Sequence, residues 1–153
     1  MAQLSIVRPG EGEMGELRGV RMRVLEDGST TDHRIGVIEM TLAPGGTGPQ
    51  QHRHSLHDEG FYIVSGTVRF TVGDADHDAT PGTMVMVPPG VPHTFANPGE
   101  VPAVMVSTVT PDLYMRYFED LRDWVAGGRP MTPEAQAEIM SRYATVPATD
   151  HAH

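Results

Sequence analysis

Glycine and proline interrupt this chain so often that no long helix is expected before about residue 110. The sequence holds 17 glycines and 13 prolines, which favour turns because glycine tolerates a positive φ and proline lacks the backbone N–H. Short runs rich in valine, isoleucine, threonine and phenylalanine lie between these turns, at intervals of roughly 8–12 residues. The pattern is typical of an all-β sandwich or barrel, and it argues against a helical bundle or a coiled coil.

The candidate strands of this region are short and end at turn residues. We expect them at residues 20–25, 35–42, 60–64, 67–72, 83–87, 93–96 and 103–109. In one of them, Val68, Phe70 and Val72 alternate with polar residues, as in a strand with one buried face. Ser65-Gly66 predicts a tight hairpin, and residues 73–76 predict the next turn.

The pattern changes to helices after residue 109. Pro111 suits the first turn of a helix, and apolar residues then recur at helical spacing from Leu113 to Trp124. Glycines follow directly, so the first helix is expected at residues 113–126. A second helix is expected at residues 132–143, and both are amphipathic enough to pack on the barrel.

No linker-sized polar stretch separates the helices from the β region. The whole chain, residues 1–153, is therefore expected to form one domain, with the barrel core at about 17–110 and the helices at about 111–145. Residues 146–153 are expected to be a tail, frayed from residue 150 onward.

Composition excludes several kinds of chemistry. The sequence has 20 acidic and 11 basic residues and a net charge of −9, which disfavours binding to nucleic acid or to an anionic membrane. Lysine and cysteine are both missing, which excludes Schiff-base and thiolate mechanisms as well as disulfides. A basic start followed by an apolar run is also missing, as is any long apolar stretch, so we expect a cytoplasmic protein whose chemistry uses histidine and carboxylate.

Two histidines and a glutamate lie close together near the middle of the chain. His52 and His54 are two residues apart, so in an extended segment both imidazoles point to the same face. Glu59 follows after a short turn and precedes the strand expected at 60–64. Such a set can supply three ligands to one divalent ion; the alternative is a group of polar side chains in a solvated loop.

A third histidine, His93, follows a Pro-Gly turn and begins an apolar strand. A histidine on the buried side of such a strand needs either a hydrogen-bond acceptor or a metal ion. His57 is expected to be an exposed turn residue, with a proton shuttle as the alternative. The remaining histidines, at positions 33, 77, 151 and 153, lie in polar turns or in the tail.

The two histidine-containing stretches resemble the two signatures of the cupin superfamily. From Gly46 to Gly66 the spacing is Gly, five residues, His-x-His, four residues, Glu, six residues, Gly. From Gly82 to Asn97 it is Gly, five residues, Pro-x-Gly, two residues, His, three residues, Asn, and 15 residues separate the two stretches. The segment from His52 to Gly66 is similar to single-domain cupins of the quercetin 2,3-dioxygenase-like group. It reads His-Arg-His-Ser-Leu-His-Asp-Glu-Gly-Phe-Tyr-Ile-Val-Ser-Gly.

The resemblance implies a small antiparallel double-stranded β-helix, a jelly-roll barrel, followed by two C-terminal α-helices. It also implies one divalent transition metal ion per subunit (Fe, Mn, Ni, Co, Cu or Zn), with His52, His54, Glu59 and His93 as its ligands. Such a site has one or two positions left for water, O2 or substrate. Glu59 could also act as a catalytic base when it leaves the metal.

The side chains expected around this centre are apolar. If Glu59 points inward, Phe61 and Ile63 share its face, and Phe95 shares that of His93. Two methionines also lie together on one face of their strand, and we expect all five to line the substrate pocket: Phe61, Ile63, Phe95, Met84 and Met86. The alternative for each is plain barrel core. An apolar or aromatic small molecule is the expected partner, bound by a homodimer.

Three functions follow from these features. The first and leading one is a metal-dependent, quercetinase-like dioxygenase acting on an aromatic or enolisable small molecule. The second is a non-oxidative isomerase, dehydratase or polyketide cyclase in which the metal serves only as a Lewis acid. The third is a non-catalytic cupin that binds a small ligand. Oxygen consumption distinguishes the first from the second, and turnover distinguishes both from the third.

Overall fold

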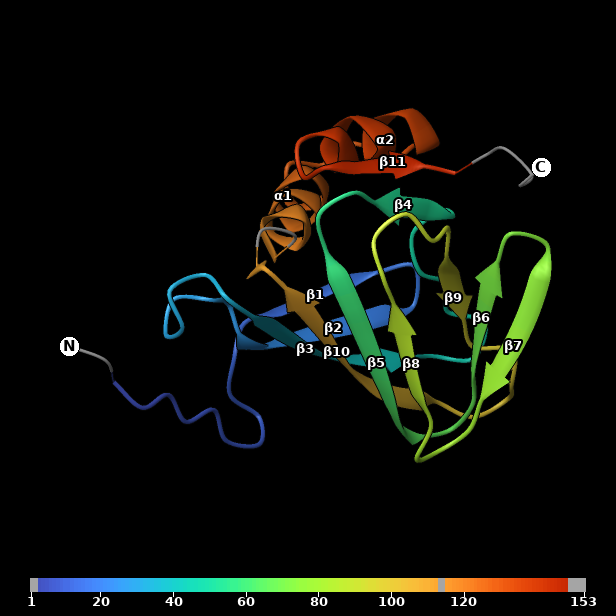
Figure 1. Cartoon of the computed structure of the whole chain (residues 1–153), viewed down its shortest axis with the longest axis horizontal. Coiled ribbons are helices and arrows are strands. Elements are labelled where there is room, and N and C mark those ends of the chain that lie inside the picture. The colour runs from blue at the N-terminus through green and yellow to red at the C-terminus, as the bar shows by residue number, and fades with distance from the viewer. Residues whose placement is uncertain (1–2, 113–114, 149–153) are drawn as a thin grey trace.

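Two main β-sheets enclose the core of the protein, and a small third sheet lies at one end of them (Figure 1). The computed structural model describes residues 3–112 and 115–148. The largest sheet has the order β1 (Met14–Leu17), β2 (Val20–Glu26), β3 (Gly36–Leu42), β10 (Ala103–Thr110), β5 (Asp58–Ser65) and β8 (Met84–Val87). The second has the order β7 (Ala75–Ala79), β6 (Val68–Val72) and β9 (Thr94–Ala96), and the third pairs β11 (Thr145–Pro147) with β4 (His52–His54).

Strict alternation places the apolar side chains inside. In β3 every second residue is buried, and Ile38, Met40 and Leu42 have at most 1% of their surface exposed, as a strand with one face on the core requires. Phe61 from the large sheet meets Phe70 and Phe95 from the second sheet, with ring centroids 5.1 and 5.8 Å apart. The antiparallel jelly-roll barrel expected from the sequence is confirmed.

Two turns differ from the prediction. The hairpin expected at Ser65-Gly66 is wrong, because β5 and β6 belong to different sheets and the chain crosses between them there. Gly66 makes this crossing with φ of +72°, and a Cβ on it would lie 2.6 Å from the carbonyl oxygen of Pro102. The turn expected at 73–76 is shorter than predicted, because β7 already begins at Ala75 and pairs with β6.

Both C-terminal helices are present. Helix α1 is Met115–Ala126 and helix α2 is Pro133–Ser141; Leu113, the predicted start of the first helix, lies outside the described residues. The Thr132 hydroxyl accepts a hydrogen bond from Ala135 N–H and caps α2. Tyr117 and Leu121 of α1 pack with Ile139 of α2 in a second apolar cluster.

The sequence predicts a tail from residue 146 onward. This prediction is wrong for residues 146 and 147, which belong to strand β11. Strand β11 pairs antiparallel with β4, so the chain returns to the barrel before it ends. Residues 149–153, with His151 and His153, lie outside the described residues. Within the described part of the chain, neither helix combines the length and apolar character needed to cross a bilayer.

Candidate metal centre

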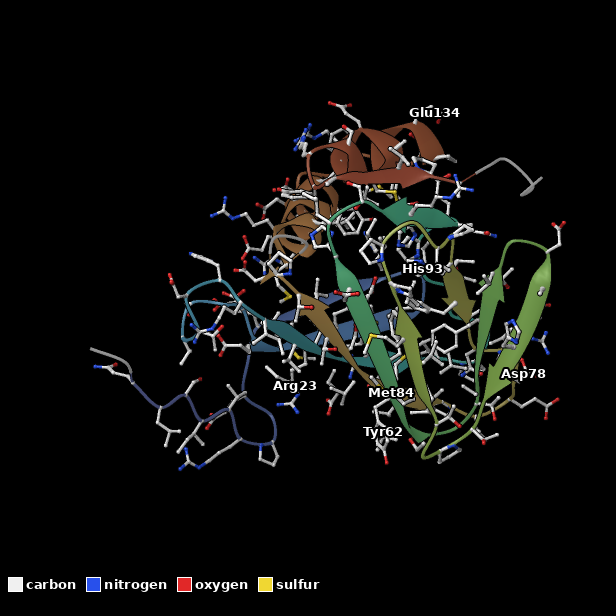
Figure 2. All side chains as sticks on the ribbon, in the orientation of Figure 1. Arg23, Tyr62, Asp78, Met84, His93 and Glu134 are labelled. Carbon is white, nitrogen blue, oxygen red and sulfur yellow. The ribbon has the colours of Figure 1, made fainter. Side chains whose placement is uncertain are left out.

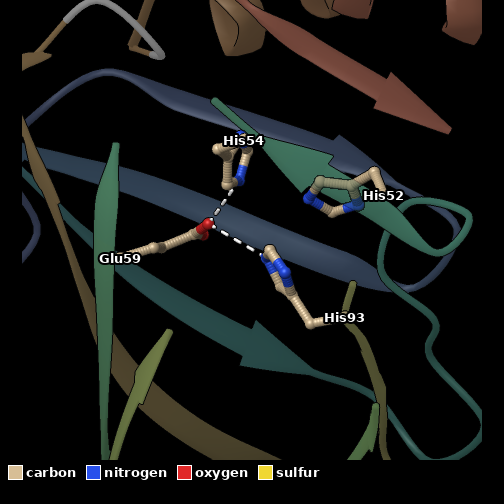
Figure 3. Close-up of side chains that lie close together, drawn as sticks. All are labelled: His52, His54, Glu59 and His93. Atoms are coloured by element: carbon tan, nitrogen blue, oxygen red, sulfur yellow. Dashed lines mark hydrogen bonds and ion pairs between the residues drawn. The ribbon is translucent and has the colours of Figure 1, made fainter. Parts of the chain in front are cut away.

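The four predicted ligands come from three separate segments that meet inside the barrel (Figure 3). His52 and His93 lie directly opposite each other, because each backbone N–H donates to the carbonyl of the other, at 3.1 and 3.0 Å. His54 is two residues further along β4, so its side chain falls on the same face as that of His52. Glu59 is at the start of β5, opposite Val109 and Val87.

The four side chains are close together and shielded from solvent. The Oε2 atom of Glu59 is 2.7 Å from Nε2 of His54 and 3.2 Å from Nε2 of His93. The ligand atoms of all four residues lie within 4.8 Å of one another. At most 3% of the surface of each residue is exposed, so the solvated-loop alternative does not hold.

Hydrogen bonds to the outer nitrogens fix the tautomers of the three imidazoles. Nδ1 of His52 lies 2.8 Å from the carbonyl oxygen of Gln50, and Nδ1 of His93 lies 3.0 Å from that of Val91. Because a carbonyl oxygen can only accept, both Nδ1 atoms carry the proton. Each ring therefore presents its Nε2 to the centre in the form that binds a metal ion.

His54 has a side-chain partner in place of a carbonyl. Its Nδ1 is 2.8 Å from Oγ1 of Thr145, and that hydroxyl donates its proton to the carbonyl oxygen of Tyr143 at 3.0 Å. A hydroxyl has one proton, so Thr145 must accept from His54 Nδ1–H. All three histidines thus carry a proton on Nδ1 and turn Nε2 toward the centre. At His54 and His93 a further proton lies between Nε2 and the Glu59 carboxylate, at the position that a metal ion would take.

The buried carboxylate of Glu59 is charged and needs positive charge close to it. Burial raises the pKa of Glu59, but the hydrogen bonds from His54 and His93 outweigh that effect and bring the pKa below its usual range. Burial opposes the charged form of His93, but its hydrogen bond to Glu59 raises its pKa. Burial and the neighbouring imidazoles of His93 and His54 lower the pKa of His52 to about 3, so His52 stays neutral. Protons or a metal ion must balance the carboxylate.

The donor set fits a divalent transition metal. Three imidazole nitrogens and one carboxylate oxygen suit the borderline ions from Mn(II) to Zn(II), whereas Mg²⁺ and Ca²⁺ prefer oxygen ligands throughout. The residues present therefore fit the metal ion that the sequence resemblance implied. The outer-shell partners of the histidines match the arrangement that orients metal ligands in proteins.

Three of the five predicted pocket residues face the barrel interior. Phe61 and Ile63 are fully buried and Phe95 nearly so, and the ring of Phe61 lies 6.5 Å from that of His93. Phe95 also lines a largely apolar cavity beside Met22, Met40 and Leu121. The interior next to the metal centre is thus apolar and aromatic, and the contact of these residues with substrate stays a prediction.

The other two predicted pocket residues, Met84 and Met86, lie on the opposite face of the sheet. They are 50% and 56% exposed, and Met84 lies beside Tyr62 on the outside of the barrel (Figure 2). The prediction that they line the pocket is wrong, because Val85 and Val87 take the inward positions of β8. The homodimer stays a prediction.

His57 was expected to be exposed, and that expectation is wrong. The residue is fully buried, with its ring edge-on to that of His54 at 5.2 Å. Burial, with a smaller effect of His54, lowers its pKa to about 4. Its neighbours Ser55 and Leu56 are exposed, so only the imidazole of this turn points inward. Ser55 N–H and Ser55 Oγ both bond to the carbonyl of Ala144, which attaches the turn to the C-terminal segment.

We expect His57→Ala to lower stability without removing the metal. A cavity beside His54 should reduce the free energy of unfolding by about 1–3 kcal/mol, measured by urea denaturation of the metal-free protein. Metal content should stay unchanged and activity should fall less than tenfold. His77→Ala, at an exposed position in β7, is the control and should change neither quantity. A folded His57→Ala protein that has lost its metal would place His57 among the ligands.

The comparisons with known proteins agree with this geometry. Residues 38–109 match the family model described as Cupin domain. Protein SchB of Streptomyces halstedii is 27% identical over 94 residues, which are 61% of this chain and 68% of SchB.

Two solved structures illustrate the range of similar proteins. A sugar phosphate isomerase of the cupin superfamily from Silicibacter pomeroyi has 26% identity and a TM-score of 0.56, over 60% of this chain and 59% of that one. The polyketide cyclase RemF from Streptomyces resistomycificus has 19% identity and a TM-score of 0.63, over 71% of this chain and 80% of RemF. The chain thus spans less than two thirds of the isomerase.

Proposed function

We propose that the protein is a metal-dependent enzyme that moves a proton on a small, enolisable carbonyl compound, because residues 38–109 match the cupin domain model and four side chains able to bind a metal ion converge inside the barrel. One observation carries the proposal: three imidazole Nε2 atoms, with tautomers fixed by their outer partners, face a buried carboxylate. One divalent transition metal ion per subunit would be held there.

The chain's own residues supply three elements of the reaction. A bound divalent ion would polarise a carbonyl oxygen and stabilise the charge that develops on it. His52, His54 and His93 would hold that ion, and the buried carboxylate of Glu59 is the group able to accept a proton from an adjacent carbon. Phe61 and its apolar neighbours keep water away from the charge that forms.

The surroundings of the centre favour an aromatic or otherwise apolar substrate. A sugar phosphate, the substrate class named for the isomerase relative, needs cationic or amide donors for its phosphate. The residues that face the interior beside Glu59 are instead Phe61 and Ile63. A flat compound with a β-dicarbonyl or phenolic group matches both the apolar walls and the metal.

A quercetinase-like dioxygenation is the second candidate, and the likeness of the His52–Glu59 stretch to that group favours it. Its substrates would share the enolisable group, but the reaction would consume O2. The isomerase and cyclase names of the two structural relatives support the non-oxidative reaction as the first candidate.

One experiment separates these candidates. Untagged protein is analysed for metal and then mixed with a panel of aromatic β-dicarbonyls and flavonols in D2O, with an oxygen electrode in the cell. We expect about one metal ion per chain and deuterium incorporation without oxygen uptake. Oxygen uptake that matches substrate loss would replace the proposal with the dioxygenase. Binding without exchange or uptake for any compound would indicate a non-catalytic cupin.

A further inference from the structure

A segment outside the matched region lies against the candidate metal centre. The family match ends at residue 109, yet β11 pairs with the strand that carries two of the four ligands. In this ladder Thr145 lies opposite His54, and Pro147 lies opposite His52. Figure 1 shows β11 beside β4, above the barrel, although about 90 residues separate them along the chain.

Hydrogen bonds around this ladder attach the C-terminal segment to the whole ligand strand. On one side Ser55 N–H bonds to the carbonyl of Ala144, and on the other Ala148 N–H bonds to the carbonyl of Gln51. Gln136 of α2 also accepts from Gln50 N–H at 3.3 Å. The segment therefore contacts the backbone on both sides of His52 and His54.

The three histidines differ in how their outer nitrogen is held. His52 and His93 each use a carbonyl two residues earlier in their own segment, so their orientation is local. His54 uses the hydroxyl of Thr145, which is 99% buried and 91 residues away in the sequence. Its tautomer thus depends on the docking of β11.

We propose that Thr145 is a positioning residue for His54, and that β11 is consequently part of the metal centre. The proposal rests on the proposed function only in so far as the centre binds a divalent ion. Without the Thr145 hydroxyl, the His54 tautomer with its proton on Nδ1 loses the hydrogen bond that favours it. The tautomer with the proton on Nε2 keeps its acceptor, the Glu59 Oε2 atom 2.7 Å away. A proton at that position occupies the site of the metal ion, which must displace it to bind.

The test compares three variants of the full chain. Thr145→Val keeps the shape of the side chain but removes the hydroxyl, and Thr145→Ser keeps the hydroxyl. Val146→Thr is the matched control, at an exposed position of the same strand. The dissociation constant for Co(II) is measured by competition, together with the visible absorption spectrum of the bound ion. We expect Thr145→Val to bind Co(II) about 10–100-fold more weakly, with an altered spectrum. Thr145→Ser and Val146→Thr should stay within about threefold of the starting protein.

A second readout needs no metal. Long-range ¹H–¹⁵N spectra of the metal-free protein report which imidazole nitrogen carries the proton. We expect a proton on Nδ1 of His54 in the starting protein and in Thr145→Ser, and its loss from Nδ1 in Thr145→Val. An unprotonated His54 Nδ1 in the starting protein overturns the proposal, even where Thr145→Val fails to fold. So does a Thr145→Val protein with unchanged affinity and spectrum. A starting protein with the expected tautomer that binds no divalent ion would instead overturn the proposed function.

Discussion

Replacing His93 with alanine should remove nearly all bound metal from the protein. His93 is the candidate ligand supplied by the second sequence stretch, and it joins that stretch to His52 through two backbone hydrogen bonds and to Glu59 through its ring. Loss of one imidazole from the set leaves an incomplete, solvent-filled coordination sphere. We expect affinity to fall on the order of 100-fold or more, beyond the effect of an outer-shell change.

The measurement is elemental analysis of untagged protein after dialysis, with thermal unfolding as a second readout. A metal ion that binds only the folded protein raises the free energy of unfolding. The increase grows with the logarithm of the ratio of the free metal concentration to the dissociation constant. Saturating metal should therefore raise the Tm of the starting protein much more than that of His93→Ala. His52→Ala should behave in the same way, and His77→Ala, which changes an exposed histidine, should keep its metal. Unchanged metal content in both His52→Ala and His93→Ala would contradict the ligand assignment.

The second large effect is expected for Glu59→Gln. The amide has nearly the same shape as the carboxylate but no negative charge, and it cannot accept a proton from carbon at neutral pH. We expect the variant to keep some metal, held by the three histidines, and to lose activity by roughly 100- to 10,000-fold, the usual range for a general base. Activity is measured as the rate of deuterium exchange at saturating metal. A lower rate then reflects the loss of the base and not a lower occupancy of the metal site.

Asp58→Asn provides the control for this loss. It makes the same chemical change at the neighbouring carboxylate, which is exposed, and should leave both metal content and exchange rate unchanged. Full activity of Glu59→Gln at saturating metal would show that neither the charge nor the basicity of Glu59 matters to the reaction. Loss of all metal from Glu59→Gln would show that Glu59 is a ligand that the site needs. Its part in proton transfer would then be tested with a different substitution, one that keeps the metal.

The outcome for the pocket residues shows where a sequence pattern is ambiguous. Phe61 and Ile63 could be placed inside because they share a face with Glu59, a polar residue whose burial the ligand spacing already implied. In β8, methionine alternates with valine, so both faces of the strand are apolar and no polar residue marks the outer one. Register with β5 decided the orientation: Met84 lies opposite Tyr62 and shares its exposed face.

His57 and Thr145 show a different limit. A histidine in a polar turn is normally exposed, whereas this one is buried with its ring against that of His54. Strand β11 has three residues, too few for a period-2 pattern to be visible. Its role beside His54 depends on a pairing across about 90 residues of sequence, which no local signal reports.

The sequence by itself determined the barrel, through its pattern of strands and turns, and its resemblance to the two cupin signatures identified the four side chains that converge inside it. A separation of two positions places His52 and His54 on one face of a strand, and glycine and proline mark the turns that end the strands. The tertiary structure decided what long-range packing controls: the outward face of Met84 and Met86, the burial of His57, and the hydroxyl that orients His54. These features arise where segments distant in the chain meet. The energy of such a contact depends on both segments together, so the residue pattern of one segment alone does not predict it.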